Sequence, residues 1–116
     1  MLTILWTDGS PGLQVHLDGT WTDVAHVPDA LVVNLGDMLE RWTNGMYRST
    51  RHRVVSVTGR GRYSCPFFFE PNFDTVVEAL PGCCGPDSPP KYPPTTSGQH
   101  LLDKYAATHA GFEEGK

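Results

Sequence analysis

The stretch RSTRHRVVSVTGRGRYSCPFFF, residues 48–69, decides the expected fold of this chain. Its two halves, 48–57 and 62–69, carry valine, threonine and phenylalanine, which favour β-strands. The glycines of residues 59–61 lie between the halves and favour a turn. We therefore expect two strands joined at 59–61.

Shorter β-type segments fill the rest of the first 80 residues. Alternating apolar and polar residues mark the strands, and turn pairs such as Asp8–Gly9 and Asp18–Gly19 mark their limits. We also expect a helical turn at 37–43 with Asp37 as its N-cap. Many short strands at this spacing are typical of a sandwich or barrel, so the expected fold class is mainly β. The further predicted strands are 2–6, 13–17, 20–24, 30–35 and 75–80.

The character of the sequence changes at Pro81. Six of the ten prolines lie between 81 and 94, which predicts an irregular arm that wraps the sheet, or a linker. A helix with an apolar stripe follows, with Ser97 as N-cap and Gly111 after its end. The expected division is therefore a β domain at 1–80, a Pro-rich arm at 81–96, and a C-terminal helix at 97–111 that packs on the domain.

Composition excludes several classes of protein. The net charge of -4 gives no support to a nucleic-acid partner, although six of the nine basic residues are arginines between Arg41 and Arg62, where solvated strand faces are the favoured interpretation. Three cysteines, Cys65, Cys83 and Cys84, suit neither a disulfide framework nor a zinc site and indicate reduced thiols. No signal peptide or membrane span is predicted, so we expect a cytoplasmic protein without membrane contact.

His52 is the first candidate for chemistry. Side chains alternate along a strand, so His52 should share a face with Thr50 and Val54, while Arg51 and Arg53 point the other way. A histidine on an inward strand face is either a hydrogen-bonded core residue or a metal ligand. The spacing alone leaves both interpretations open.

Arg62 and Ser64 form the second candidate. They are two residues apart on a predicted strand, so both side chains should point to one face. A guanidinium beside a hydroxyl can hold a carboxylate through two N–H groups and one O–H group. An arginine and a serine at this spacing are also common without any function.

The ordered combination of these segments carries more information than any one of them. Five blocks resemble, in order and spacing, the C-terminal dioxygenase domain of isopenicillin N synthase-like enzymes, within the 2-oxoglutarate/Fe(II)-dependent dioxygenase superfamily. The Pro-rich segment that leads into the last helix resembles it too. The blocks are GLQV at 12–15, DGTWTDV at 18–24, LVVNLGDMLERWTNG at 31–45, YRSTRHRV at 47–54 and RYSCPFFF at 62–69.

The resemblance implies a partial double-stranded β-helix, or jelly roll, with two facing sheets. It implies Fe(II) and 2-oxoglutarate as cofactor and cosubstrate, and oxidation of a small organic substrate. His52 corresponds to the distal histidine of the iron triad, and Arg62 and Ser64 to the residues that hold the far carboxylate of 2-oxoglutarate. His52 and Arg62 should then reach one cavity from the two sheets.

The sequence departs from the family at its start. The family's other two iron ligands belong to an H-x-D motif just before the segment that matches Leu2–Leu5, and no such motif precedes that segment here. His16 lies inside a hairpin strand and Asp8 follows the first strand, so neither is a substitute. We therefore expect the C-terminal portion of an oxygenase, inactive alone, and assign no catalytic residue.

A different class of function remains open. The chain could be a non-catalytic jelly-roll binding module derived from the family, which associates with itself or a partner through open strand edges. Whichever function holds, the missing strands of the jelly roll should leave inward-facing side chains such as Val15, Val33 and Phe68 exposed. The cosubstrate is a further alternative, because family members that bind another carboxylate also carry the R-x-S pattern.

Overall fold

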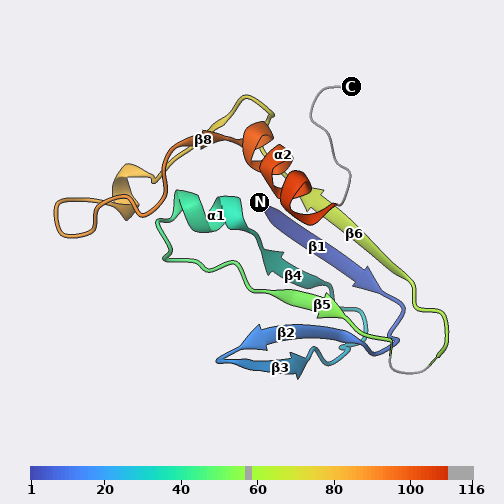
Figure 1. Ribbon diagram of the computed structural model, residues 1–116. Helices are drawn as coiled ribbons and strands as arrows, with labels where there is room; N and C mark the ends of the chain where they lie inside the picture. Colours follow the sequence, from blue (N-terminus) through green and yellow to red (C-terminus); the bar gives the residue numbers. More distant parts are fainter. Residues whose placement is uncertain (57–58, 110–116) are drawn as a thin grey trace.

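Two three-stranded antiparallel sheets form the body of the computed structural model, which describes residues 1–56 and 59–109 (Figure 1). The strand order of one sheet is β4-β1-β6, and that of the other is β3-β2-β5. A further two-stranded ladder joins β7 and β8. The strands are β1 (Leu2–Thr7), β2 (Leu13–Leu17), β3 (Thr20–Asp23), β4 (Val32–Leu35), β5 (His52–Val54), β6 (Ser64–Phe69), β7 (Val76–Val77) and β8 (Thr95–Thr96).

The helical elements lie at one side of the two sheets (Figure 1). They are α1 (Asp37–Trp42), a single 3-10 turn η1 (Pro81–Cys83) and α2 (Ser97–Thr108). The prediction of a mainly β chain with a helix after the Pro-rich segment is therefore confirmed. The predicted C′ position, Gly111, lies outside the described residues.

The strand register decides which side chains face the space between the sheets. Thr7 pairs with Ser64, and Thr3 pairs with Phe68, so these side chains share one face of the β4-β1-β6 sheet. Thr7 also lines a cavity between the two sheets, which makes this the inner face. Val33 pairs with Ile4 on the opposite face. The prediction that Val33 faces inward is therefore wrong, whereas Phe68 does lie on the inner face.

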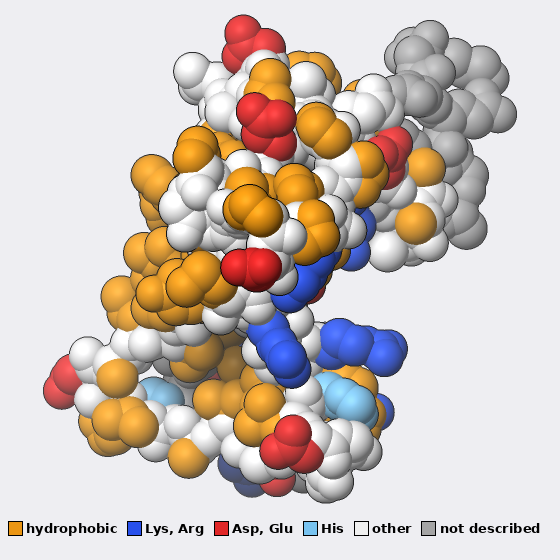
Figure 2. All heavy atoms as spheres, turned by 90° about the vertical axis from the view of Figure 1, so that its left-hand side faces the viewer, with side chains coloured by type: hydrophobic (Ala, Val, Ile, Leu, Met, Phe, Trp, Pro, Cys, Tyr) orange, Lys and Arg blue, Asp and Glu red, His pale blue; other side chains and the backbone are white. Residues whose placement is uncertain are grey.

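Large apolar side chains remain exposed on both faces of the β4-β1-β6 sheet. Phe67 is 61% exposed on the outer face and Phe68 is 63% exposed on the inner face. Figure 2 shows hydrophobic side chains at the surface along one flank of the molecule. Contiguous exposed apolar surface of this kind usually marks a place where another part of a protein packs. The outer face carries Leu2, Ile4, Trp6, Val33, Leu35, Phe67 and Phe69.

The best-packed part of the chain surrounds α1. Val77 of β7 is fully buried, and Met38 of α1 is 4% exposed. Residues 48–51, predicted to continue a strand, instead run past α1, because Glu40 accepts the N–H of Ser49 through its carboxylate at 2.5 Å. The strand therefore shortens to the three residues of β5.

The Pro-rich arm is ordered and wraps α1 rather than a sheet. Its anchor is Asn44, which is 2% exposed and follows α1 in the left-handed conformation (φ 52°). The Asn44 amide donates to the carbonyls of Cys83 and Pro89, both at 3.2 Å, and its oxygen accepts the N–H of Lys91 at 2.8 Å. One buried side chain thus provides the partners of three backbone groups in the middle of the arm, whose end pairs with β7 through β8.

Both predicted helix caps differ from the observed ones. The N-cap of α1 is Gly36, without a side-chain bond, so Asp37 begins the helix instead of capping it. The N-cap of α2 is Thr96, whose hydroxyl accepts the N–H of Gln99 at 3.1 Å. Ser97, the predicted cap, is the first residue of α2 and is buried.

Asp37 is used to attach α2 to α1. Its carboxylate lies 2.6 Å from the Lys104 ammonium. Burial raises the pKa of Asp37, but hydrogen bonds from Lys104 and Ser49 and the Lys104 charge outweigh this, so the pKa lies below the ordinary 3.8. His100 is 3.9 Å from Asp37, but burial, together with the Arg41 charge, lowers the pKa of His100. That contact is therefore not an ion pair at neutral pH.

We expect this attachment to weaken in acid. A carboxyl group whose pKa is lowered by folding stabilises the folded state above pH 3.8, and this contribution is lost as pH falls through the folded-state pKa. The unfolding free energy of the unmodified chain should exceed that of Asp37→Asn at pH 6, and the difference should shrink toward pH 2.5. Urea unfolding followed by circular dichroism measures it, and a difference independent of pH would contradict the assignment.

Candidate cosubstrate site

Arg62 and Ser64 lie together at the start of β6. The Arg62 Nη1 group donates to the Ser64 hydroxyl oxygen at 3.3 Å, which confirms that the two side chains share a face. Ser64 accepts in this bond, so its own O–H remains available as a donor. The Arg62 Nε is buried and has no hydrogen-bond partner in the part of the chain that the structure describes. A buried unpaired N–H group is costly, so this donor is suited to an acceptor from outside the chain.

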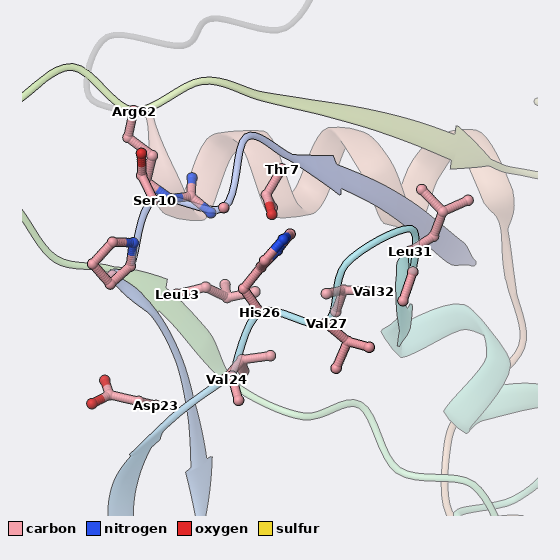
Figure 3. Close-up of a pocket in the computed structure, with 15 residues that line it drawn as sticks. Thr7, Ser10, Leu13, Asp23, Val24, His26, Val27, Leu31, Val32 and Arg62 are labelled. Carbon is pink, nitrogen blue, oxygen red and sulfur yellow. The ribbon is translucent and has the colours of Figure 1, made fainter.

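Arg62 lines a cavity of about 260 Å³ between the two sheets. In Figure 3, Thr7 and His26 point toward each other across it, and the Arg62 guanidinium reaches in beside Ser10. Leu13 of β2 closes the cavity from the second sheet. The cavity thus combines mostly apolar walls with two charged side chains, Arg62 and Asp23, and the Asp23 carboxylate already accepts a hydrogen bond from Gln14.

Asp8 holds the backbone next to this pair. Its Oδ2 accepts the N–H of Tyr63 at 2.9 Å, and its own N–H donates to the carbonyl of Tyr63 at 3.1 Å. Its Oδ1 accepts the N–H of Ser10 at 2.9 Å. The hydrogen bond that the Asp8 carboxylate accepts from Tyr63 is the main cause that lowers the pKa of Asp8. The bond from Ser10 and the positive charge of Arg62 lower this pKa further.

His52 lies on β5 in the other sheet. It pairs with Val15, on the same face of that sheet as Leu13, so it faces the space between the sheets. Arg53 points the other way, with its guanidinium 4.1 Å from the Trp21 ring centre. Of the two candidate residues Arg62 and His52, Arg62 lines the cavity and His52 does not.

The His52 side chain is exposed on the described part of the chain and makes one contact through its ring. Its Nδ1 lies 3.1 Å from the carbonyl oxygen of Thr50. If Nδ1 carries the proton and donates to this carbonyl, the lone pair of Nε2 is free to bind a metal.

The turn between β1 and β2, residues 8–12, connects both candidate regions. At one end Asp8 holds Tyr63, between Arg62 and Ser64. At the other end the Gly12 carbonyl accepts the N–H of Val55, three residues after His52, at 2.9 Å.

The sequence profile of the 2OG-Fe(II) oxygenase superfamily matches residues 1–71. The chain belongs to the 2OG-Fe(II) oxygenase superfamily. It is 45% identical to the 2-oxoglutarate-Fe(II) type oxidoreductase hxnY of Emericella nidulans, over 99% of this chain and 34% of that protein. It is 41% identical to kihadalactone A synthase LFS of Citrus sinensis, over 90% of this chain and 32% of that protein.

Solved oxygenase structures share the fold. Neurospora crassa T7H, in complex with alpha-KG, superposes with a TM-score of 0.82 at 37% identity, over 93% of this chain and 35% of T7H. JOX2, in complex with 2OG, Fe and JA, superposes with a TM-score of 0.83 at 38% identity, over 88% of this chain and 30% of JOX2. The jelly-roll fold is therefore confirmed, and the chain spans about a third of the length of these oxygenases.

The two cofactors of the superfamily fit this chain differently. The unpartnered Nε of Arg62, beside the free O–H of Ser64, suits a carboxylate such as the far end of 2-oxoglutarate. Iron in these oxygenases needs a facial set of two histidines and a carboxylate. Residues 1–56 and 59–109 bring no three metal-ligating side chains together. The described residues of this oxygenase chain therefore contain no complete set of iron ligands, whereas the donors of Arg62 and Ser64 match a carboxylate in chemistry.

Sequence reasoning missed the long-range hydrogen bonds of two acidic residues, Asp8 beside the Arg62–Ser64 pair and Glu40 in α1. The sequence places Asp8 in a turn and gives it no ligand role, whereas its use as an acceptor for Tyr63 depends on pairing across 55 residues. Glu40, which ties Ser49 and the Tyr92 hydroxyl to α1, also acts at long range, and its bond raises the pKa of Tyr92. An Asp at the end of a strand before a Gly–Ser turn was the one available signal for Asp8.

Proposed function

We propose that this chain supplies the 2-oxoglutarate clamp and one iron ligand of a non-haem Fe(II)- and 2-oxoglutarate-dependent oxygenase. Arg62 and Ser64 would hold the far carboxylate of the cosubstrate, and His52 would bind the iron. The buried, unpartnered Nε of Arg62 carries this proposal. Because the chain spans 34% of hxnY and 35% of T7H, the activity belongs to a longer protein that contains such a segment.

The contacts around α1 suggest how the chain divides into structural segments. We propose that residues 1–80 form part of the oxygenase domain, that the Pro-rich arm at 81–96 is tied to α1, and that the segment 97–111, which contains α2, is fixed against α1. Asn44 supports this division, because its side chain bonds the Pro-rich arm to the end of α1. Lys104 supports it as well, because it ties α2 to Asp37 of α1.

The substrate of the proposed oxygenase is a small organic molecule. The structures of N. crassa T7H with thymine and of JOX2 with JA place substrates of this size in related proteins. The charge of -4 is consistent with a protein that has no nucleic-acid partner. No described helix is long and apolar enough to cross a membrane. We propose a cytoplasmic location, in which the free thiols of Cys65, Cys83 and Cys84 stay reduced.

A chimera tests the proposed function. This chain would replace the matching third of N. crassa T7H, and Co(II), a spectroscopic substitute for Fe(II), would be titrated anaerobically. We expect a one-to-one site with visible d–d bands in the chimera, its loss in His52→Ala, and no such site in the isolated chain, because three protein ligands are needed. Loaded with Fe(II) and supplied with O2, the folded chimera should also convert 2-oxoglutarate to succinate and CO2, with one oxygen atom of O2 entering succinate. A one-to-one Co(II) site in the isolated chain, or a folded chimera whose site survives His52→Ala, would refute the proposed ligand set.

The exposed apolar face favours a second candidate function, a binding module that associates with itself. Strands β3, β4, β5 and β6 lie at sheet edges, and the outer face of the β4-β1-β6 sheet is apolar. Open edges and apolar patches both promote association. We expect the isolated chain to form oligomers in sedimentation velocity, and Phe67→Ser together with Phe69→Ser to shift it toward monomer. A monomer at all concentrations would contradict this function.

A further inference from the structure

We propose that Asp8 is a positioning residue for the cosubstrate clamp, which it orders by holding the backbone of Tyr63. The proposal rests on the proposed function in one respect, namely that Arg62 and Ser64 bind a carboxylate. The geometry of Asp8 itself is independent of that assignment.

The β1–β6 ladder ends where the clamp begins. The last residue pair of the ladder is Thr7 with Ser64, so Arg62 and Tyr63 lie beyond the end of β6. The two bonds between Asp8 and Tyr63 extend the pairing by one more step. In the second of them a side-chain oxygen takes the place of a backbone carbonyl. Tyr63 is thereby fixed although it lies outside the strand.

Fixing Tyr63 fixes both of its neighbours. Arg62 and Ser64 flank it and project to the same side, as shown by the bond between them at 3.3 Å. Strand β6 is at the edge of its sheet, so among the described strands β1 is its sole neighbour, and an end without pairing would fray. Without the Asp8 acceptor, Arg62 would keep its bond to Ser64 but lose a defined direction relative to the cavity.

The charge of Asp8 is placed so that it does not neutralise Arg62. Both carboxylate oxygens accept backbone N–H groups, from Ser10 and from Tyr63. Among the described residues no ion pair joins Asp8 to Arg62. The guanidinium therefore stays available for a carboxylate in the cavity, while the nearby negative charge favours its orientation. The lowered pKa of Asp8 is consistent with an ionised acceptor at neutral pH.

Nuclear magnetic resonance of the chain itself provides the first test. In Asp8→Ala the Tyr63 amide should lose protection from hydrogen exchange by roughly tenfold or more, since its acceptor is removed, and the Arg62 Nε–H signal should broaden or shift. In Asp8→Asn, which keeps one side-chain oxygen, both effects should be smaller. The matched control is Asp18→Asn, in the exposed turn between β2 and β3, which should change neither signal. Unchanged exchange at Tyr63 in Asp8→Ala would overturn the proposal.

The T7H chimera provides the functional test. Asp8→Ala should raise the KM for 2-oxoglutarate roughly tenfold, while kcat and Co(II) affinity change less than about threefold, as expected for loss of one ordered hydrogen bond near a charged group. A merely structural defect would lower the folded fraction and kcat instead of KM. If Asp8→Ala fails to fold, Asp8→Asn carries the same comparison.

The two proposals fail in different ways. If Arg62→Lys raises the KM for 2-oxoglutarate and the folded Asp8 variants do not, the positioning role is wrong and the proposed function stands. If Arg62→Lys also leaves this KM unchanged, the carboxylate clamp itself is wrong.

Discussion

Arg62→Lys in the T7H chimera should weaken 2-oxoglutarate binding by about 2–4 kcal/mol, the typical cost of disturbing one partner of a buried charge pair. The far carboxylate of a dicarboxylate would be buried between the sheets, where a charge must be paired and hydrogen-bonded. Lysine restores the charge, but not the planar arrangement of donors that lets Nη1 bind Ser64 while Nε remains for the ligand. Equilibrium titration followed by the Co(II) spectrum measures the affinity.

Ser64→Ala is the matched weaker change. It removes one hydroxyl donor and should cost roughly 1–2 kcal/mol of 2-oxoglutarate binding, as for one hydrogen bond to a charged group. Neither Arg62 nor Ser64 is a metal ligand, so Co(II) affinity should barely change in either variant. Normal 2-oxoglutarate affinity together with lost Co(II) binding would show that the roles of β5 and β6 have been exchanged.

Asn44→Ala should be the most destabilising single change outside the site, by roughly 3 kcal/mol. The amide is 2% exposed, and its loss leaves the carbonyls of Cys83 and Pro89 and the N–H of Lys91 without their partner. Alanine also disfavours the left-handed backbone of this position, where φ is 52°. Urea unfolding at several protein concentrations measures the free energy of unfolding and separates it from association.

Asn44→Gly is the control for the backbone. Glycine accepts the left-handed conformation but carries no amide, so its cost isolates the three hydrogen bonds to the arm. Asn44→Asp keeps an acceptor for Lys91 but places a carboxylate oxygen against the carbonyls of Cys83 and Pro89, and should also destabilise strongly. A loss below 1 kcal/mol in Asn44→Ala would mean that the arm is held by other contacts.

Local patterns in the sequence predicted the order of the strands and the pairs of side chains that depend on alternation. His52 and Arg53 do point to opposite faces, and Arg62 does meet Ser64. Alternation is set by the backbone geometry of a strand, so it needs no knowledge of the partner strand. The functional roles of His52, Arg62 and Ser64 remain predictions.

Features that depend on distant partners could not be predicted in the same way. The predicted face of Val33 is wrong because a continuous run of apolar residues does not indicate which side chains point inward. That is decided by the register of β4 against β1, in which Val33 pairs with Ile4. Residues 48–51 left the strand because Glu40 binds Ser49. The sequence predicts an irregular arm, but the bonds that attach it to Asn44 span 39, 45 and 47 residues and have no local signature.

The turn at residues 8–12 is bonded both to the proposed carboxylate-binding pair and to the strand of the proposed iron ligand. One end is bonded to Tyr63 beside the clamp, and the other to Val55 just after the proposed iron ligand. In an assembled oxygenase the separation between metal and far carboxylate must equal the length of the acid that bridges them. Adding or deleting a residue in this turn would alter that separation without touching a ligand. The acids accepted by such an enzyme would then differ in the number of carbons between their ends.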